Sequence, residues 1–182
     1  MTATVGVLAL QGGFAAHARM LRGLGAEVRE VRVPGDLEGL DGLVMPGGES
    51  TTMTLGIERE GLAQPLRDFG KPILGTCAGL ILLDRAHLGM MDVAAARNAF
   101  GRQVHSFEAD LDFGAAVDGG PVHAVFIRAP WVAEHGPGVE VLAAVDGHPV
   151  AVREGSMLAL SFHPELGGDD RLHRLFLEGV GG

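Results

Sequence analysis

The stretch Pro72-Ile-Leu-Gly-Thr-Cys-Ala-Gly-Leu-Ile-Leu-Leu83 decides the fold class of this sequence. It begins with the short apolar run of a buried strand and ends with the apolar pattern of a helix. Between the two, Gly75-Thr-Cys77-Ala-Gly79 has the form of a nucleophile elbow, the sharp turn that carries a nucleophile from a strand into a helix. We therefore predict a buried strand that ends just before Cys77 and a helix that begins just after it.

Strand and helix patterns alternate along the N-terminal side of this stretch. Strands are expected at residues 5–10, 27–33 and 43–45, the second nearer the sheet edge, and helices at residues 14–24, from about 50 to 60, and 62–69. Alternation at this spacing is typical of βαβ units, which build a mostly parallel sheet with helices on both faces.

The second half of the chain has a different character. Short strand patterns separated by turns are expected at residues 104–111, 122–127, 139–145, 149–153 and 157–162, before a final helix at residues 170–178. No repeat, low-complexity tract or linker interrupts the chain. We predict one domain over residues 1–182: a flavodoxin-like, three-layer α/β domain with a mostly parallel central sheet and additional antiparallel strands in its second half. Ligands should bind at the carboxyl ends of the strands.

Composition narrows the possible partners. The net charge of −9 argues against a general nucleic-acid binder, because affinity for phosphate backbones depends on clustered Lys and Arg. No stretch approaches the roughly 20 apolar residues needed to cross a bilayer, and residues 1–10 lack signal-peptide features. A single cysteine cannot form an internal disulfide, which suits a reducing compartment. We therefore expect a cytoplasmic protein without a nucleic-acid or membrane partner.

Cys77 is either a packed thiol or a nucleophile. Free cysteines are often buried as small apolar side chains, which favours packing when the residue is considered alone. Its position in the elbow favours the nucleophile, because the start of a helix stabilises a thiolate and glycines at positions 75 and 79 allow a close approach of neighbouring elements. The backbone N–H of Ala78 would then donate to an oxyanion.

A cysteine nucleophile needs a base and a group that orients the base. Ser161-Phe-His163-Pro-Glu165 offers both at the end of a predicted strand, where residues two apart on extended backbone point the same way. Pro164 between them restricts the backbone. For the other seven histidines we expect surface or capping roles: His17, His87, His105, His123, His135, His148 and His173.

Pro46-Gly-Gly-Glu-Ser-Thr-Thr52 also joins a strand to a helix, and three interpretations are open. A Gly-rich loop at a helix start can bind phosphate, but this one lacks the Gly-Lys-Ser/Thr ending of a P-loop. It can instead form a substrate and oxyanion loop that faces the elbow. In the plainest interpretation, Ser50 or Thr51 caps the helix. Cys77 and the scattered histidines have no zinc-ligand spacing, so we expect neither a metal nor a cofactor.

The motifs P-G-G-E-S, G-T-C-A-G and F-H-P-E-L, in this order, resemble those of the triad-type (class I) glutamine amidotransferases. Other strings resemble one family among them, the glutaminase subunit of pyridoxal 5′-phosphate synthase (the PdxT or Pdx2 family). These strings begin at Leu8, Gly47, Arg97, Ser106 and Phe126 and read LALQG, GGESTTM, RNAFGRQ, SFEAD and FIRAP. The resemblance extends over nearly the whole chain, from Val5 to Phe176.

The resemblance implies a function and a set of site residues. A family member hydrolyses L-glutamine to L-glutamate and passes the ammonia to a barrel-shaped synthase subunit, with which it forms a hetero-oligomer that makes pyridoxal 5′-phosphate (vitamin B6). Cys77, His163 and Glu165 would form the catalytic triad, and Gly48 and Ala78 would stabilise the oxyanion. The residues implied in glutamine binding are Gly47, Gly48, Glu49, Ser50, Arg97, Ile127 and Arg128. An Arg suits the substrate carboxylate.

Two alternatives remain open. The chain could be the glutaminase subunit of another amidotransferase, for instance in histidine or nucleotide biosynthesis, since the triad would be identical. It could also be a non-catalytic flavodoxin-like binding module in which Cys77 only packs.

Overall fold

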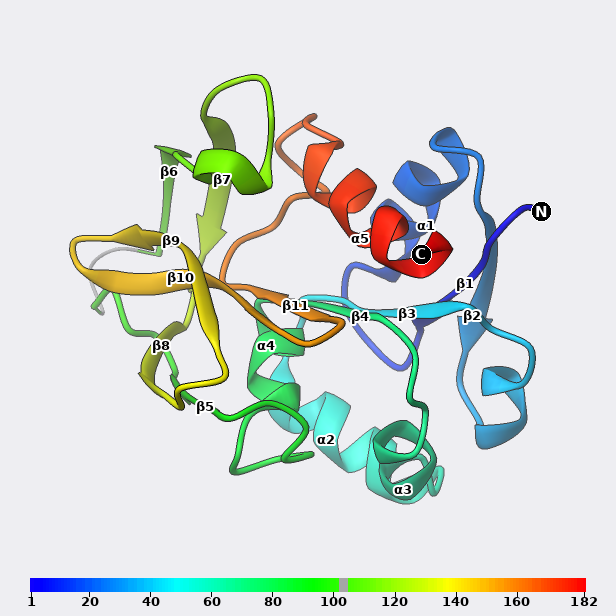
Figure 1. Cartoon of the computed structure of the whole chain (residues 1–182). Helices are drawn as coiled ribbons and strands as arrows, with labels where there is room; N and C mark the ends of the chain where they lie inside the picture. Colours follow the sequence, from blue (N-terminus) through cyan, green and yellow to red (C-terminus); the bar gives the residue numbers. More distant parts are fainter. Residues whose placement is uncertain (102–104) are drawn as a thin grey trace.

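The computed structural model describes residues 1–101 and 105–182 and has a seven-stranded sheet at its centre (Figure 1). The strands are β1 (Thr4–Leu8), β2 (Glu27–Val31), β3 (Gly42–Met45), β4 (Ile73–Thr76), β5 (Val93–Ala96), β6 (Ser106–Leu111), β7 (Val122–Ile127), β8 (Trp131–His135), β9 (Glu140–Val145), β10 (His148–Glu154) and β11 (Met157–Leu160). The helices are α1 (Phe14–Gly23), α2 (Ser50–Arg59), α3 (Ala63–Arg67), α4 (Ala78–Leu83) and α5 (Arg171–Gly181), with short 3-10 turns η1 (Pro34–Leu37) and η2 (Gly114–Ala116).

The central sheet has the order β2-β1-β3-β4-β11-β10-β9. Its first five strands pair in parallel, whereas β10 pairs antiparallel with both β11 and β9. β2 lies at the edge, as its alternation of charged and apolar residues predicts. The mostly parallel sheet with added antiparallel strands is confirmed.

Helices cover both faces of the sheet (Figure 1). α1 and α5 lie on one face, where Leu21 and Phe176 join a buried cluster with side chains of β1, β3 and β4. α2, α3 and α4 lie on the other face, where Met53 and Leu66 belong to a second cluster. Because each central strand contributes to both clusters, it is buried on both sides, which explains its continuous apolar sequence. The three-layer α/β fold is thus confirmed.

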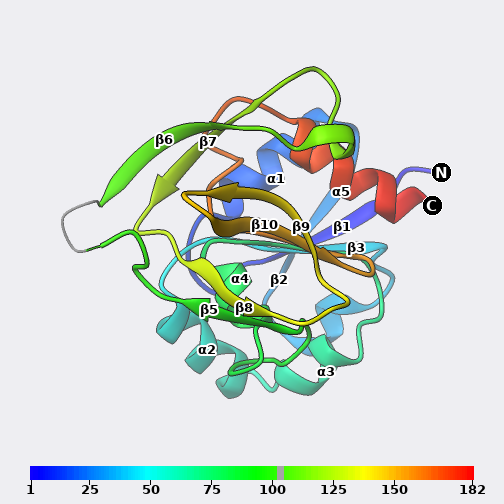
Figure 2. The same cartoon turned by 60° about the vertical axis from the view of Figure 1, so that its left-hand side comes forward.

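Two small antiparallel sheets flank the β9–β10 end of the central sheet (Figure 2). One pairs β6 with β7, and the other pairs β5 with β8. The sequence analysis did not predict β5 or β8. In β5, Val93 is the single β-branched residue and is followed by three alanines, which have little strand propensity. β5 forms instead through its long-range pairing with β8.

The other predicted elements differ from the observed ones mainly at their ends. The strand expected at residues 157–162 ends at Leu160, and the strand expected from residue 104 is observed as β6, which begins at Ser106. Val104, together with Arg102 and Gln103 of the Arg97 block, lies outside the described residues. Within residues 1–101 and 105–182, none of the helices has the length and apolar character required to cross a bilayer.

Candidate active site

Three of the predicted site segments, together with Gln11, lie at the carboxyl ends of four neighbouring strands. β1, β3, β4 and β11 lie side by side in the sheet. Gln11 follows β1, Gly47 follows β3, Cys77 follows β4 and His163 follows β11. Because parallel strands end at the same edge of a sheet, segments far apart in the sequence meet there, as expected for a doubly wound fold.

Cys77 occupies a strained turn between β4 and α4. Its φ of 53° and ψ of −106° lie in a region that residues other than glycine seldom adopt. A side chain on Gly79 would collide with the carbonyl oxygen of Met45, so only glycine permits α4 to lie this close to β3. Cys77 itself is 7% exposed. This is the elbow geometry expected from the sequence.

His163 and Glu165 come together through a turn rather than along an extended strand. The N–H of Leu166 donates to the carbonyl oxygen of His163 over 3.2 Å, which closes a four-residue turn. Pro164 occupies its second position, which proline favours. Nδ1 of His163 lies 2.7 Å from Oε1 of Glu165. The extended geometry predicted for this pair is therefore wrong, although the contact between the two side chains does form.

The charges of this pair reinforce one another. Burial alone would lower the pKa of His163, but hydrogen bonds with Cys77 and Glu165 outweigh it and raise that pKa to about 10. Burial alone would raise the pKa of Glu165, but the hydrogen bond to His163 lowers it below its usual value. At neutral pH the arrangement thus favours an imidazolium between Cys77 and a buried carboxylate.

The loop after β3 packs directly against this cluster. A Cβ atom on Gly47 would lie 2.5 Å from Cε1 of His163 and 3.3 Å from Cβ of Cys77. The N–H of Gly13 donates to the carbonyl oxygen of Gly47 over 2.9 Å. The N–H of Glu49 donates to Oε1 of Gln11 over 2.7 Å. The segment after β1 therefore fixes the conformation of this loop.

Gln11 was not predicted as a site residue. It supports the Gly47-Gly48-Glu49 segment rather than touching Cys77, and its position directly after the buried β1 strand is the sequence feature that could have identified it.

Glu49, not Ser50 or Thr51, caps α2. Its carboxylate accepts hydrogen bonds from the N–H of Thr51 over 3.1 Å and from the N–H of Thr52 over 2.7 Å. The hydroxyl and N–H of Thr52, followed by the N–H of Thr51, lower the pKa of Glu49 to about 2. The predicted cap is wrong because the longer Glu side chain, one residue earlier, reaches the first free N–H groups, while Ser50 is already the first helical residue and is buried.

Arg97 and Arg128 line a common cavity of about 610 Å³, together with Asn98, Phe100, Gly101, His105 and Ala129. Arg97 also donates to Oγ1 of Thr51 over 3.2 Å, which connects the cavity to the start of α2. On the other side, Sγ of Cys77 lies 3.9 Å from the carbonyl oxygen of Ile127, the residue before Arg128. The two arginines thus sit beside the cysteine cluster, not within it.

His17 and His173 contradict the surface or capping role expected for them. Both are fully buried, and Nδ1 of His17 lies 2.9 Å from Nε2 of His173. Nε2 of His17 lies 3.2 Å from Oε2 of Glu165. In the sequence, each of these histidines is spaced so that it falls on the apolar face of its helix, α1 or α5. This position on an apolar face is the signal that could have distinguished them from the exposed histidines.

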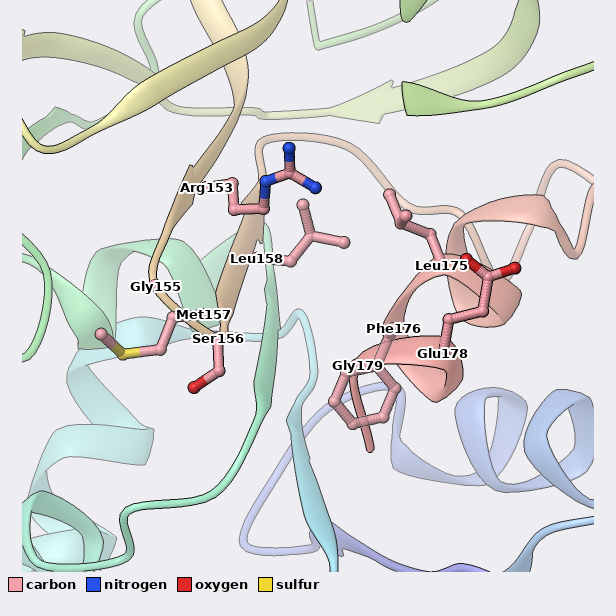
Figure 3. Close-up of a pocket in the computed structure, with 9 residues that line it drawn as sticks. All are labelled: Arg153, Gly155, Ser156, Met157, Leu158, Leu175, Phe176, Glu178 and Gly179. Atoms are coloured by element: carbon pink, nitrogen blue, oxygen red, sulfur yellow. The ribbon is translucent and has the colours of Figure 1, made fainter. Parts of the chain in front are cut away.

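A separate cavity of about 270 Å³ lies between the β10–β11 turn and α5 (Figure 3). Arg153 and Leu175 stand on opposite sides of it. Its wall includes Met157 at the start of β11, whereas His163 follows the end of that strand. This cavity is therefore at the opposite end of the sheet from the cysteine cluster and takes no part in it.

Comparison with known proteins adds independent information. The model of the SNO glutamine amidotransferase family matches residues 7–181. Pyridoxal 5′-phosphate synthase subunit PdxT from Parafrankia sp. (strain EAN1pec) is 55% identical over 96% of this chain and 91% of its own length. The protein of the same name from Mycobacteroides abscessus is 53% identical over 99% of this chain and 98% of its own.

Solved structures of similar fold include a glutamine amidotransferase. A crystal structure of a glutamine amidotransferase, 49% identical, superposes with a TM-score of 0.89 over 98% of this chain and 99% of that one. The structure of PurLQS from Thermotoga maritima has a TM-score of 0.75 over 98% of this chain and 99% of that one, but only 19% identity. The second likeness concerns the fold alone.

Proposed function

This chain belongs to the SNO glutamine amidotransferase family, and we propose that it hydrolyses L-glutamine to L-glutamate and ammonia for the synthesis of pyridoxal 5′-phosphate. The single observation that carries the proposal is the cluster formed by Cys77 in its strained elbow, His163, and Glu165 at 2.7 Å from His163. Nucleophile, base and orienting carboxylate are the parts that acyl transfer requires.

In the first half-reaction, the sulfur of Cys77 attacks the side-chain carbonyl carbon of glutamine. The oxyanion of the tetrahedral intermediate accepts hydrogen bonds from the N–H groups of Gly48 and Ala78. Ala78 is the first residue of α4, so its N–H has no acceptor within that helix. The C–N bond then breaks while His163 gives its proton to the leaving nitrogen. With a pKa of about 10, His163 carries that proton at neutral pH.

In the second half-reaction, water hydrolyses the glutamyl thioester. His163, now neutral, takes a proton from the water that attacks the acyl carbon. The carbon–sulfur bond breaks, glutamate leaves and the cysteine–histidine pair is restored. Glu165 stays ionised throughout and holds the imidazole in place, a role supported by its burial and its lowered pKa.

Recognition of the amino-acid end of glutamine is assigned to groups around the adjoining cavity. Arg97 and Arg128 provide positive charge for the substrate carboxylate. Glu49, Ser50 and the backbone at Gly47 and Ile127 provide further polar groups near the cysteine. The positive φ of Arg128, 44°, supports a positioned rather than a freely solvated residue, since such a backbone is rare outside glycine.

The partner we propose is the barrel-shaped synthase subunit that receives the ammonia in a hetero-oligomer. The names of the relatives support this partner, because these relatives are subunits of pyridoxal 5′-phosphate synthase. Residues 1–182 would form one amidotransferase domain in the cytoplasm, without a nucleic-acid or membrane partner. The family match over residues 7–181 supports the single domain, and the net charge of −9 supports the absence of nucleic acid.

The test is glutamate release by the purified chain, measured alone and with a saturating pyridoxal 5′-phosphate synthase subunit. We expect release with the partner and none after Cys77→Ala. Release without any effect of the partner would indicate a glutaminase that serves another synthase. No release from a correctly assembled complex would indicate a binding module and overturn the proposal.

A further inference from the structure

The carboxylate of Glu165 is held from two sides. Its Oε1 contacts His163, while its Oε2 lies 3.2 Å from Nε2 of His17 on α1. The side chain of Glu165 is 2% exposed and that of His17 is fully buried. Oε2 has no hydrogen-bond partner of good geometry among the described residues, and Nε2 of His17 is the nitrogen that lies next to it. Oε2 of this buried carboxylate therefore depends on one histidine for a hydrogen-bond donor.

The neighbours of His17 determine which nitrogen carries its proton. A neutral imidazole has one donor and one acceptor nitrogen. With a lone pair on Nε2, His17 would point that lone pair at the anionic Oε2, so the proton belongs on Nε2. Nδ1 is then the acceptor, and His173 donates to it from Nε2 over 2.9 Å. Nδ1 of His173, which has no partner in the described part of the chain, is then a lone pair rather than a buried N–H without an acceptor.

We propose that His17, supported by His173, is a positioning residue for glutamine hydrolysis: its Nε2–H holds Oε2 of Glu165, so that Oε1 stays directed at Nδ1 of His163. This inference rests on the proposed function, since it concerns the same triad. It adds a second imidazole on the far side of the carboxylate, contributed by α1 and steadied by α5.

The charges around His17 agree with a neutral donor. Burial lowers the pKa of His17, which Glu165 raises and His163 lowers to smaller extents. Burial, followed by His17, lowers the pKa of His173 to about 3, against smaller opposing effects of Glu165 and Asp170. Oγ1 of Thr76, 3.2 Å from Nε2, is the remaining polar contact of His17 in the described structure. Both imidazoles are therefore uncharged at neutral pH, and the positive charge of the cluster stays on His163.

Loss of this donor has a defined consequence. Without His17, Oε2 of Glu165 is a buried anionic oxygen with no compensation, so the carboxylate either turns away or takes up a proton. Each response weakens its interaction with the imidazolium of His163. The proton then shifts from His163 back towards Cys77, so less of the reactive thiolate–imidazolium pair is present, and kcat falls while glutamine binding, which uses other residues, changes little.

The experiment compares His17→Leu, which removes the donor, with His17→Gln, whose amide nitrogen can occupy the place of Nε2. His135→Leu, at an exposed position at the end of β8, is the matched control. Each protein, in complex with the synthase subunit, is assayed for kcat and KM, and the rate of Cys77 alkylation by iodoacetamide is measured at pH 7. For His17→Leu we expect a kcat lower by about 10- to 100-fold with KM little changed, and an alkylation rate lower by about 10-fold. His17→Gln should recover most of both properties, and the control should match the wild type.

An unchanged kcat and an unchanged alkylation rate in folded His17→Leu would overturn the inference. The inference would also be overturned if kcat fell only in proportion to the fraction of protein whose Cys77 can be alkylated, because that result indicates a structural role alone. A folded His17→Gln protein whose kcat is about 10-fold or more below that of the wild type would exclude the donor role, and this result does not depend on whether His17→Leu folds. Alkylation requires no glutamine, so it distinguishes failure of this inference from failure of the proposed function.

Discussion

The backbone of Gly47 lies so close to His163 that a Cβ atom at residue 47 would be 2.5 Å from Cε1 of the imidazole. This approach joins the loop after β3 to the turn after β11 and leaves no room for a side chain. The same added Cβ atom would also be 3.3 Å from the Cβ atom of Cys77, so the loop passes close to the cysteine as well. The glycine is thus a requirement of the site and not only of the turn.

Gly47→Ala should inactivate the enzyme while leaving it folded. The added methyl group must displace the imidazole, and a misplacement of about 1 Å can cost about 100-fold in rate. Overpacking should lower the free energy of unfolding by about 1–3 kcal/mol. Glutamate release and urea denaturation measure the two effects. Gly23→Ala is the matched control: a Cβ there meets no described atom within 4 Å, so activity should persist and stability should rise by up to about 1 kcal/mol.

Cys77 should react with a glutamine-analogue electrophile to give a covalent adduct of one equivalent. Because the chain has a single cysteine, intact-mass analysis assigns a thiol adduct without digestion. Cys77→Ala should form no adduct, and its kcat should be lower by at least about 1,000-fold. An assembled, folded complex that forms no adduct would contradict the assignment of the nucleophile.

Arg128→Ala should raise KM for glutamine about 10- to 100-fold, because a charge-assisted hydrogen bond to the substrate carboxylate is lost. Alkylation of Cys77 by iodoacetamide, which has no carboxylate, should keep its rate. Arg153→Ala is the control. It removes an arginine that pairs with Glu140, away from the cavity lined by Arg97 and Arg128, and it should leave KM unchanged. Wild-type KM in the Arg128 variant would remove this residue from the substrate site.

The ionisation of His163 should make stability depend on pH. Its folded pKa of about 10 lies above the value of 6.5 for an unperturbed histidine, so the folded protein retains a proton that the unfolded chain loses. The contribution of His163 to the free energy of unfolding should be complete below about pH 6.5 and decline as the pH rises towards 10. Urea denaturation of wild type and His163→Gln at several pH values measures it. A difference between the two proteins that is constant from pH 6 to 10 would disprove the shift.

Much of the fold followed from local patterns. The strand–turn–helix around Cys77 was predictable because alternating apolar runs, glycines and a nucleophile at fixed spacing constrain a few adjacent residues. The parallel half of the sheet followed from βαβ alternation in the same way. β5 and β8 did not, because the alanine-rich β5 segment has little strand propensity of its own and is ordered by a partner about 40 residues away.

The candidate site divides along the same line. The sequence by itself determined the elbow and the proximity of His163 to Glu165, since each depends on residues two positions apart. Glu49 caps α2 through N–H groups two and three residues further on, so this contact is local as well, although Ser and Thr are the more usual capping residues. The contacts of Gly47 with His163 and of His17 with Glu165 required the tertiary structure, because they arise where different strands and helices pack together. A buried histidine on an apolar helix face has the same local sequence whether its partner is a carboxylate or a methyl group.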